Sequence, residues 1–377
     1  MGALLLKLSF TGLPLLTPFF FRSFRHVCRP VWTSVRMQTF EPVRFAAGPE
    51  LFVLPSPSIR TRDGDGIRQK GAGYWIDGSN LTCEPPRAPL SSDHVVIYFG
   101  GDVQDAEEEM RKSREAKKFI EYSLEKTAVS LGRKFSSKTS QADVVVVRPR
   151  LLNHLTSLFK PFLFQVNLRG EATPSPHYES KTSRYIFEVL RLTHQGCTDE
   201  QLQQNLRVTL VGFSRGVSVL TQLFHEALPE NPCRWQAQSL LLSPMLEAVY
   251  VLDGGSNVPP VLPVDRQIFD SLSELRKTRG LPPLPVGLFG SSYQWKCNVR
   301  PWIGEEKMRF VEIVSEVALQ DAVTLQELEL DEKILGEAAR QKHPEGIPPD
   351  AFRLFIHFEV SRLFPVLPVH QHRAAHE

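Results

Sequence analysis

The chain contains the stretch Leu206-Arg-Val-Thr-Leu-Val-Gly-Phe-Ser-Arg-Gly-Val-Ser-Val-Leu220. Its first part is an apolar, β-branched run that ends at Val211 and is typical of a buried strand. Gly212-Phe-Ser-Arg-Gly216 follows, and Val217–Leu228 then has the character of a helix. A G-x-S-x-G pattern between a strand and a helix predicts a nucleophile elbow, a tight turn that lifts the hydroxyl of Ser214 above the end of a sheet. The alternative is a strand-to-helix turn that needs its glycines for packing alone.

Other short apolar runs predict strands of the same sheet, namely His94–Phe99, Asp143–Arg148, Ala248–Leu252 and Leu284–Phe289. Val323–Leu330 alternates like a half-buried edge strand. Helical segments separate these runs, namely Asp105–Lys134, which we expect to be a solvated outer helix, Ser180–His194 and Trp302–Val317. Connections of this length are too long for hairpins, so the pattern predicts an α/β fold with a doubly wound, mostly parallel sheet of the α/β-hydrolase type.

Length and composition divide the chain into parts. A chain of 377 residues suits one large α/β domain with insertions. We expect a targeting segment at 1–40, an irregular lead-in or early strands at 41–92, the α/β-hydrolase-like domain at 93–364 and a flexible tail at 365–377. Within the domain, we expect irregular connections around residues 150–180 and 256–283.

The first forty residues have the composition of a mitochondrial transit peptide. No acidic residue precedes Glu41, whereas five basic ones do: Lys7, Arg22, Arg25, Arg29 and Arg36. Without these five, the formal net charge of +2 would become −3. We therefore predict import into the mitochondrial matrix. The alternative is a secretory signal, because Leu4–Phe21 is strongly apolar, but Pro14 and Pro18 interrupt that run and also argue against a membrane-spanning helix.

Several classes of function are set aside by the sequence. The nearly balanced charge argues against nucleic acid as the main partner. No G-x-x-x-x-G-K-[ST] or G-x-G-x-x-G pattern is present to bind phosphates, and no H-E-x-x-H or other tight ligand cluster is present for a metal. The five cysteines are scattered and form neither a disulfide framework nor a metal-binding pair. We expect no cofactor and no metal.

A serine nucleophile needs a base and an acid, which in this fold follow the serine in the order acid, then histidine. Asp253 is the predicted acid because an apolar strand leads directly to Asp253-Gly-Gly255. The alternative is that this sequence is simply a tight turn, for which Asp and Gly are suited. Asp265 and Asp270 lie nearby but do not directly follow a predicted strand.

The predicted base is His357, whose apolar surroundings in Phe355–Val360 favour a position near the sheet. His343 is the alternative, since both histidines follow the last predicted strand. His357 has a second interpretation as a core histidine with one hydrogen bond. His225 lies on the helix after the elbow and is expected to point away from the serine. The remaining candidates, His370, His372 and His376, lie in the tail.

The predicted oxyanion site combines two backbone amides. One belongs to Arg215, directly after the serine, and the other to Gly101 or Asp102 in the glycine-rich turn after an early strand. An ordinary strand-end turn is the alternative interpretation of Gly100-Gly101-Asp102.

Several segments resemble the mitochondrial α/β-hydrolase-like proteins named after human chromosome 2 open reading frame sixty-nine. The similar segments are Val95–Gln104, Thr209–Gly216, Tyr250–Gly255, Tyr293-Gln294 with Arg300–Gly304, and His357–Val360. The resemblance runs from about residue 93 to 364. It implies a mitochondrial location, the α/β-hydrolase-like fold, a hydrolase activity that is expected rather than established, and a link to energy metabolism and respiratory function. The family pattern His-Phe-x-Val near the C-terminus favours His357 as the base.

Two functions follow from these patterns. The first is a serine hydrolase, an esterase, lipase or thioesterase that acts on a small acyl substrate through an acyl-enzyme on Ser214. The second is a hydrolase-fold protein that is weakly active or inactive and works by binding a mitochondrial partner, because fold alone does not establish chemistry.

Overall fold

The computed structural model of the chain describes residues 73–77, 92–137, 141–152, 155–176, 181–194, 199–228, 239–318, 323–343 and 345–368. The targeting segment predicted at 1–40 lies outside these residues, as does most of the tail predicted at 365–377, with His370, His372 and His376. Both interpretations of the N-terminus therefore stay predictions.

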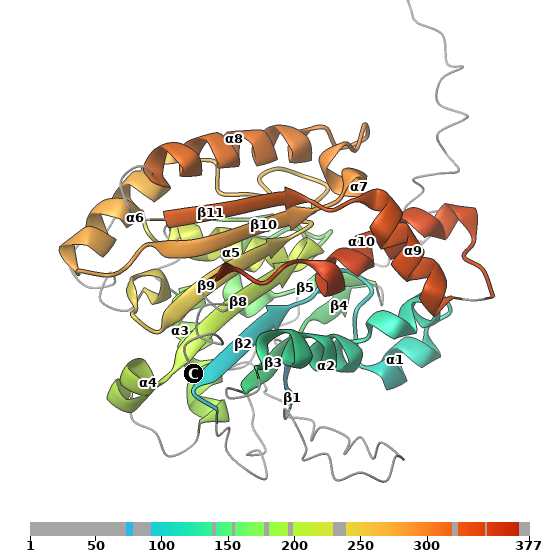
Figure 1. Cartoon of the computed structure of the whole chain (residues 1–377), viewed down its shortest axis with the longest axis horizontal. Coiled ribbons are helices and arrows are strands. Elements are labelled where there is room, and N and C mark those ends of the chain that lie inside the picture. The colour runs from blue at the N-terminus through green and yellow to red at the C-terminus, as the bar shows by residue number, and fades with distance from the viewer. Residues whose placement is uncertain are drawn as a thin grey trace, which may run out of the picture. The chain divides into compact units, whose positions relative to one another are not determined.

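A seven-stranded sheet, parallel throughout, forms the centre of the described structure. Its strands lie in the order β1 (Gly73–Asp77), β3 (Ala142–Arg148), β2 (His94–Phe99), β8 (Arg207–Phe213), β9 (Leu246–Leu252), β10 (Leu284–Gly290) and β11 (Val323–Glu329). Figure 1 shows this order from β1 at the bottom of the view to β11 at the top. The predicted parallel sheet is confirmed, and β11 is an edge strand as expected.

The direction of the winding reverses between β2 and β8. The chain passes from β2 outward to β3 and then returns past β2 to form β8. In parallel α/β sheets, ligand sites lie beyond the carboxyl ends of the strands at such a reversal. The two segments that leave β2 and β8 at this point begin at Gly100 and Ser214, so the topology brings together the predicted oxyanion turn and the elbow.

Each central strand contributes side chains to two apolar cores, one on each face of the sheet. On β2, Val95, Ile97 and Phe99 belong to one core, whereas Val96 and Tyr98 belong to the other, and all five are fully buried. Successive side chains of a strand point to opposite faces, so a strand covered on both sides is apolar throughout. This explains why the strands appear in the sequence as continuous apolar runs.

Helices cover both faces. The first core includes residues of α3 (Lys181–Thr193), α5 (Val217–His225), α6 (Arg266–Thr278) and α8 (Trp302–Ala318). The second includes residues of α2 (Leu124–Phe135), α9 (Glu332–Lys342) and α10 (Pro349–Leu363). Helices on both faces of a parallel sheet confirm the doubly wound α/β architecture. Shorter elements in the connections are α4 (Asp199–Asn205), α7 (Ser292–Trp295), and the 3₁₀ helices η6 (Ser214–Gly216) and η8 (Leu240–Leu242).

The single solvated helix predicted at Asp105–Lys134 is wrong. The segment forms α1 (Glu107–Lys112), a 3₁₀ helix η3 (Ala116–Tyr122) and α2. The Ser123 hydroxyl begins α2 by accepting a hydrogen bond from the Lys126 amide at 3.3 Å. Buried Leu124 and Leu131 lie on the face of α2 that packs against the sheet, so this face is part of the core.

The predicted irregular connections are also more ordered than expected. Within 256–283, the Asp265 carboxylate caps α6 by accepting the Gln267 amide at 2.9 Å, and Ile268 and Leu272 bury one face of the helix. Within 150–180 lie two short antiparallel pairs, β4 (Arg150–Leu152) with β5 (Thr156–Leu158) and β6 (Gln165–Val166) with β7 (Ala172–Thr173), and the 3₁₀ helix η4 (Lys160–Phe162).

The sheet includes one strand from the predicted lead-in segment. Residues of β1 pair in parallel register with β3, from Gly73 opposite Val144 to Asp77 opposite Arg148. The fold therefore begins before residue 93. Among the helices in the described part of the chain, none is both long and apolar enough to cross a bilayer.

Candidate active site

The strand, turn and helix predicted around Ser214 are present as β8, η6 and α5. Ser214 has φ +52°, a left-handed conformation that is strained for a residue with a side chain. The turn tolerates this because glycines let other backbone approach closely. A Cβ at Gly216 would lie 2.1 Å from the carbonyl oxygen of Phe99, and one at Gly101 would lie 2.7 Å from Cβ of Ser214. The serine turn therefore packs closely against the end of β2.

Asp253 lies directly after β9 and also has a left-handed backbone, with φ +43°. Its side chain is completely buried. Oδ1 accepts the amide of Ser291 at 2.7 Å, and Oδ2 accepts the Ser291 hydroxyl at 2.7 Å. Because Ser291 follows the neighbouring strand β10, these bonds fix the carboxylate across the ends of two strands. Ser291 is not among the residues predicted from the sequence, although its place directly after a predicted strand is a usable signal.

His357 is hydrogen-bonded to Asp253, with 2.7 Å between Nδ1 and Oδ2. The ring is 3 % exposed and stacks on Phe213, the residue before the serine, with centroids 4.6 Å apart and planes at 30°. The carboxylate oxygen accepts, so Nδ1 carries the proton of the neutral ring and Nε2 is left as the basic nitrogen. His357 lies within α10, and the ring of Tyr293 also contacts the imidazole, with 5.4 Å between ring centroids.

The other predicted acids and bases lie elsewhere. His343, the alternative base, contacts Phe355 with ring centroids 4.3 Å apart, and burial lowers its pKa. His225 bonds through Nδ1 to the Thr221 carbonyl at 2.8 Å. Asp265 caps α6, and Asp270 lies 3.4 Å from the guanidinium of Arg266 in an exposed ion pair.

The third partner, Ser214, is not joined to His357 in this state. Within the described part of the chain, no hydrogen bond links the Ser214 hydroxyl to the imidazole. Catalytic hydrogen bonds of this kind are often long without a ligand and shorten when substrate binds. Ser214 is 8 % exposed and borders a cavity of about 10 Å³.

The predicted oxyanion residues form a hydrogen-bonded cluster. The Gly101 amide donates to Oε1 of Gln104 at 2.8 Å and is therefore occupied within the chain. The Asp102 carboxylate accepts two bonds from the guanidinium of Arg215, from Nε at 2.8 Å and from Nη2 at 3.2 Å. Of the two alternatives predicted for the second donor, the Gly101 amide is thus occupied, and Asp102 and Arg215 as oxyanion donors stay predictions.

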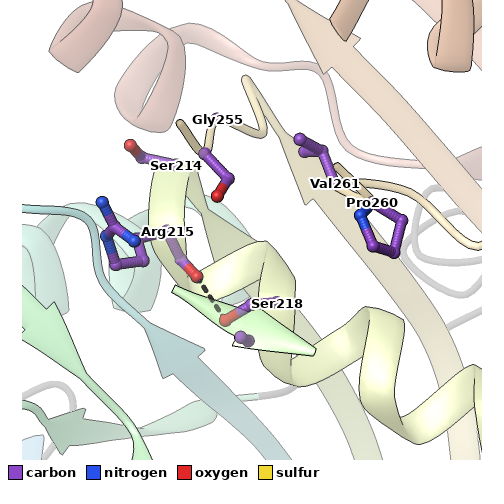
Figure 2. Close-up of a pocket in the computed structure, with 8 residues that line it drawn as sticks. Ser214, Arg215, Ser218, Gly255, Pro260 and Val261 are labelled. Atoms are coloured by element: carbon purple, nitrogen blue, oxygen red, sulfur yellow. Dashed lines mark hydrogen bonds between the residues drawn. The ribbon is translucent and has the colours of Figure 1, made fainter. Parts of the chain in front are cut away.

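Two residues that were not predicted from the sequence, Ser157 and Gln104, hold this cluster together. The Ser157 amide donates to Oδ1 of Asp102 at 2.8 Å, and the Ser157 hydroxyl donates to the carbonyl of Gly101 at 2.6 Å. Buried Gln104 also accepts the Tyr98 hydroxyl at 2.9 Å. Figure 2 shows the Arg215 guanidinium pointing away from Pro260 and Val261, toward the side opposite the cavity. The Arg215–Asp102 bonds link the serine turn to the loop after β2.

The donor set does not resemble a metal centre. Among the described residues, no group of three or more His, Cys, Asp or Glu side chains is placed to hold a metal ion. What the arrangement offers chemically is a carboxylate-oriented imidazole and a serine in a strained turn, a combination that suits acyl transfer.

Two comparisons of the sequence with known proteins find the same family. The sequence model of a family described as C2orf69 matches residues 81–173 and 167–320, a region that includes Ser214 and Asp253 and ends before His357. A zebrafish protein, "Mitochondrial protein C2orf69 homolog", is 25 % identical over 60 % of this chain and 65 % of its own length. Human "Mitochondrial protein C2orf69" is 24 % identical over 66 % of this chain and 74 % of its own.

A solved structure, described as a lipase-esterase related protein from Clostridium acetobutylicum, is 13 % identical and covers 68 % of this chain and 96 % of its own, with a TM-score of 0.26. That likeness is too distant to bear on the site. The chain spans just under two thirds of the length of the zebrafish relative.

Proposed function

The chain belongs to the C2orf69 family, and we propose that it is a mitochondrial serine hydrolase that cleaves small esters or thioesters at Ser214. The mitochondrial location is supported by the names of its relatives. The acid-free, basic composition before Glu41 favours the matrix in particular.

The hydrogen bond between Asp253 and His357 carries the proposal. The two residues are 104 positions apart in the sequence, and the carboxylate is fully buried. A buried carboxylate bonded to Nδ1 orients the imidazole and stabilises its cation, which is the role of the acid in a serine triad. The imidazole of His357 also stacks on Phe213, which directly precedes Ser214, so the proposed base lies next to the serine turn.

In the proposed reaction, Ser214 Oγ attacks the carbonyl carbon of the substrate while Nε2 of His357 takes the hydroxyl proton. Negative charge develops on the carbonyl oxygen, where the amides of Arg215 and Asp102 donate hydrogen bonds. The bond to the alcohol or thiol then breaks, and the leaving group takes the proton from His357. Water repeats the sequence on the acyl-enzyme and releases a carboxylic acid and free Ser214.

A fluorophosphonate probe tests the nucleophile directly. We expect the wild-type chain to form a covalent bond from Ser214 Oγ to phosphorus with loss of fluoride, and Ser214→Ala to remain unlabelled by mass spectrometry. Ser218→Ala is the matched control, because Ser218 borders the same cavity and its hydroxyl donates to the Arg215 carbonyl at 2.8 Å. Equal labelling of wild type and Ser214→Ala would rule out this function.

A second function is favoured by one observation, that the Ser214 hydroxyl has no bond to His357 within the described residues. On that basis the chain is a hydrolase-fold protein that supports respiratory metabolism by binding a mitochondrial partner. Rescue of respiration in cells that lack the protein separates the two functions. Full rescue by Ser214→Ala supports the binding role, whereas rescue by wild type and Ser218→Ala alone supports catalysis.

A further inference from the structure

The orientation of the His357 imidazole depends on more than its hydrogen bond to the acid. The bond between Nδ1 and Oδ2 of Asp253 holds one edge of the ring. The torsion that turns a histidine ring about its Cβ–Cγ bond is soft, so a bond at one edge leaves the tilt of the ring to be set by packing. The residues that pack on the imidazole therefore decide where Nε2 points.

Three aromatic rings contact the imidazole. Besides Phe213, they are Phe358 on α10, with 5.8 Å between centroids, and Tyr293 on α7, with 5.4 Å between centroids. Phe213 and Phe358 are buried members of the second core, whereas Tyr293 is half-buried. Its helix α7 lies beside α10 (Figure 1). Of these three contacts, the one from Tyr293 thus comes from a separate element at the border of the core.

Tyr293 belongs to a short segment that also contacts the predicted acid. Two positions before it, Ser291 donates its amide and its hydroxyl to the Asp253 carboxylate, each at 2.7 Å. The chain then turns at once, and the Trp295 amide donates to the Ser291 carbonyl at 3.0 Å. A Cβ at Gly290 would lie 2.4 Å from Cε2 of Trp295, so the indole packs on the end of β10. The backbone that carries Tyr293 is therefore held on both sides.

The same segment contacts the loop that is bonded to the serine. Gln294 is buried and lies against Gly255, because a Cβ at that glycine would be 2.5 Å from Nε2 of the glutamine. The Gly255 amide in turn donates to the Ser214 carbonyl at 3.4 Å. Nη2 of Arg300 donates to Oε1 of Gln294 at 2.9 Å and holds this side chain. The segment Ser291–Gln294 therefore contacts the acid, the base and the loop bonded to the nucleophile.

We propose that Tyr293 is a positioning residue for the base: its ring sets the tilt of the His357 imidazole and so directs Nε2 toward Ser214. Because its neighbours Ser291 and Gln294 are joined to the acid and to the serine loop, Tyr293 ties the orientation of the base to both partners. The effect on rate rests on the proposed hydrolase function. A displacement of about 1 Å in a reacting group lowers a rate by about 100-fold.

The rate at which a fluorophosphonate reacts with Ser214 in the full chain tests this role. We expect Tyr293→Ala to lower this rate by about 10- to 100-fold, and Tyr293→Phe, which keeps the ring, to react at close to the wild-type rate. In a His357→Ala background, Tyr293→Ala should cause no further loss, since no imidazole is left to orient. Tyr185→Ala is the matched control, because Tyr185 is also half-buried but packs on Phe162 and the first core.

The NMR signal of the proton on Nδ1 of His357 is a second measurement, and it does not depend on catalysis. A hydrogen bond to a carboxylate moves this signal downfield, and its absence in His357→Ala identifies it. We expect the signal in the wild type, Tyr293→Phe and Tyr185→Ala. In Tyr293→Ala it should be lost through exchange with water, because the ring is then less well held. Urea unfolding checks that each variant is folded, and Tyr293→Leu takes the place of an unfolded Tyr293→Ala.

The outcomes separate this role from the hydrolase function. An unchanged Nδ1 signal in folded Tyr293→Ala overturns the positioning role, as does a rate equal to that of a reactive wild type. An equal loss of rate in the His357→Ala background, or Tyr293→Phe as slow as Tyr293→Ala, also overturns it. A wild type that does not react at Ser214, but whose Nδ1 signal is lost in Tyr293→Ala, overturns the hydrolase function and supports the positioning of the imidazole.

Discussion

The elbow region and the α9–α10 region supply opposite halves of the candidate site and are built differently. Around Ser214, polar side chains such as Arg215, Asp102 and Gln104 are paired with groups on neighbouring loops. In the α9–α10 region, by contrast, Glu359 Oε2 and His343 Nε2 are buried without a hydrogen-bond partner in the described part of the chain. The serine turn is thus surrounded by paired polar side chains, whereas the helix that carries the base contains a buried oxygen, Glu359 Oε2, with no hydrogen-bond partner among the described residues.

A buried ion pair lies two residues beyond the predicted base. Glu359 is fully buried, accepts the Tyr122 hydroxyl at 2.6 Å and pairs with the ammonium of Lys342. Burial lowers the pKa of Lys342. Groups of this kind are costly to desolvate and become more costly when one partner is lost. We therefore expect substitutions in the α9–α10 region to change the position of His357 more readily than substitutions in the elbow region change the position of Ser214.

Asp253 links the two regions, and its removal has the largest expected effect. Asp253→Asn leaves the shape nearly intact but favours the wrong imidazole tautomer, so we expect the rate of fluorophosphonate reaction at Ser214 to fall by about 10⁴-fold. Ser291→Ala is the control, because it removes one bond to the carboxylate and keeps the carboxylate. A rate for Asp253→Asn within tenfold of wild type would mean that His357 does not act with Asp253.

Glu359→Leu tests whether the ion pair holds α10 in place. It leaves Lys342 without its carboxylate, so we expect a loss of about 3 kcal/mol in the free energy of unfolding, measured in urea. The same variant should react more slowly at Ser214, because the helix that carries His357 is then less well held.

Glu359→Gln is the matched comparison: it also removes the charge that faces Lys342 but keeps an oxygen that accepts from Tyr122, so a loss similar to that of Glu359→Leu supports the role of the ion pair. An unchanged urea midpoint for Glu359→Leu contradicts the role of the pair. A lower midpoint with an unchanged rate at Ser214 indicates that apolar packing alone positions His357.

Arg215→Met has the smallest expected effect and tests the elbow side. It removes the two bonds to Asp102 that tie together the residues whose amides we assign to the oxyanion site. We expect the rate at Ser214 to fall about tenfold, less than the loss of an oxyanion donor itself. The double variant Arg215→Met with Asp102→Asn should be no slower than Arg215→Met, because both changes break one interaction. Additive losses would show that the two side chains act separately.

The elbow half was predictable because its signals are local. The apolar run, the glycines and the helix around Ser214 lie within fifteen residues, and Asp253 follows its strand directly. The cap at Asp265 was equally local, and with Ile268 and Leu272 it would have revealed α6 had the helical spacing been followed.

The other half depends on contacts between distant residues. The Tyr122 hydroxyl meets Glu359 across 237 positions, and the Ser291 amide meets Asp253 across 38. No short pattern in one sequence specifies such pairs. His357 was found through the order of the triad and the family resemblance, but its placement within a helix was not, since Phe355–Val360 is apolar enough to suit either a helix or a strand.

The strand β1 has a consequence for processing of the chain. It pairs along the outer side of β3, where Val144–Val147 form a buried run. A protease that removed the chain through Asp77 would spare Ser214, Asp253 and His357 yet leave this valine-rich edge bare, and bare edges recruit strands from other molecules. We therefore expect a product trimmed beyond Asp77 to self-associate more than the full chain, as measured by light scattering.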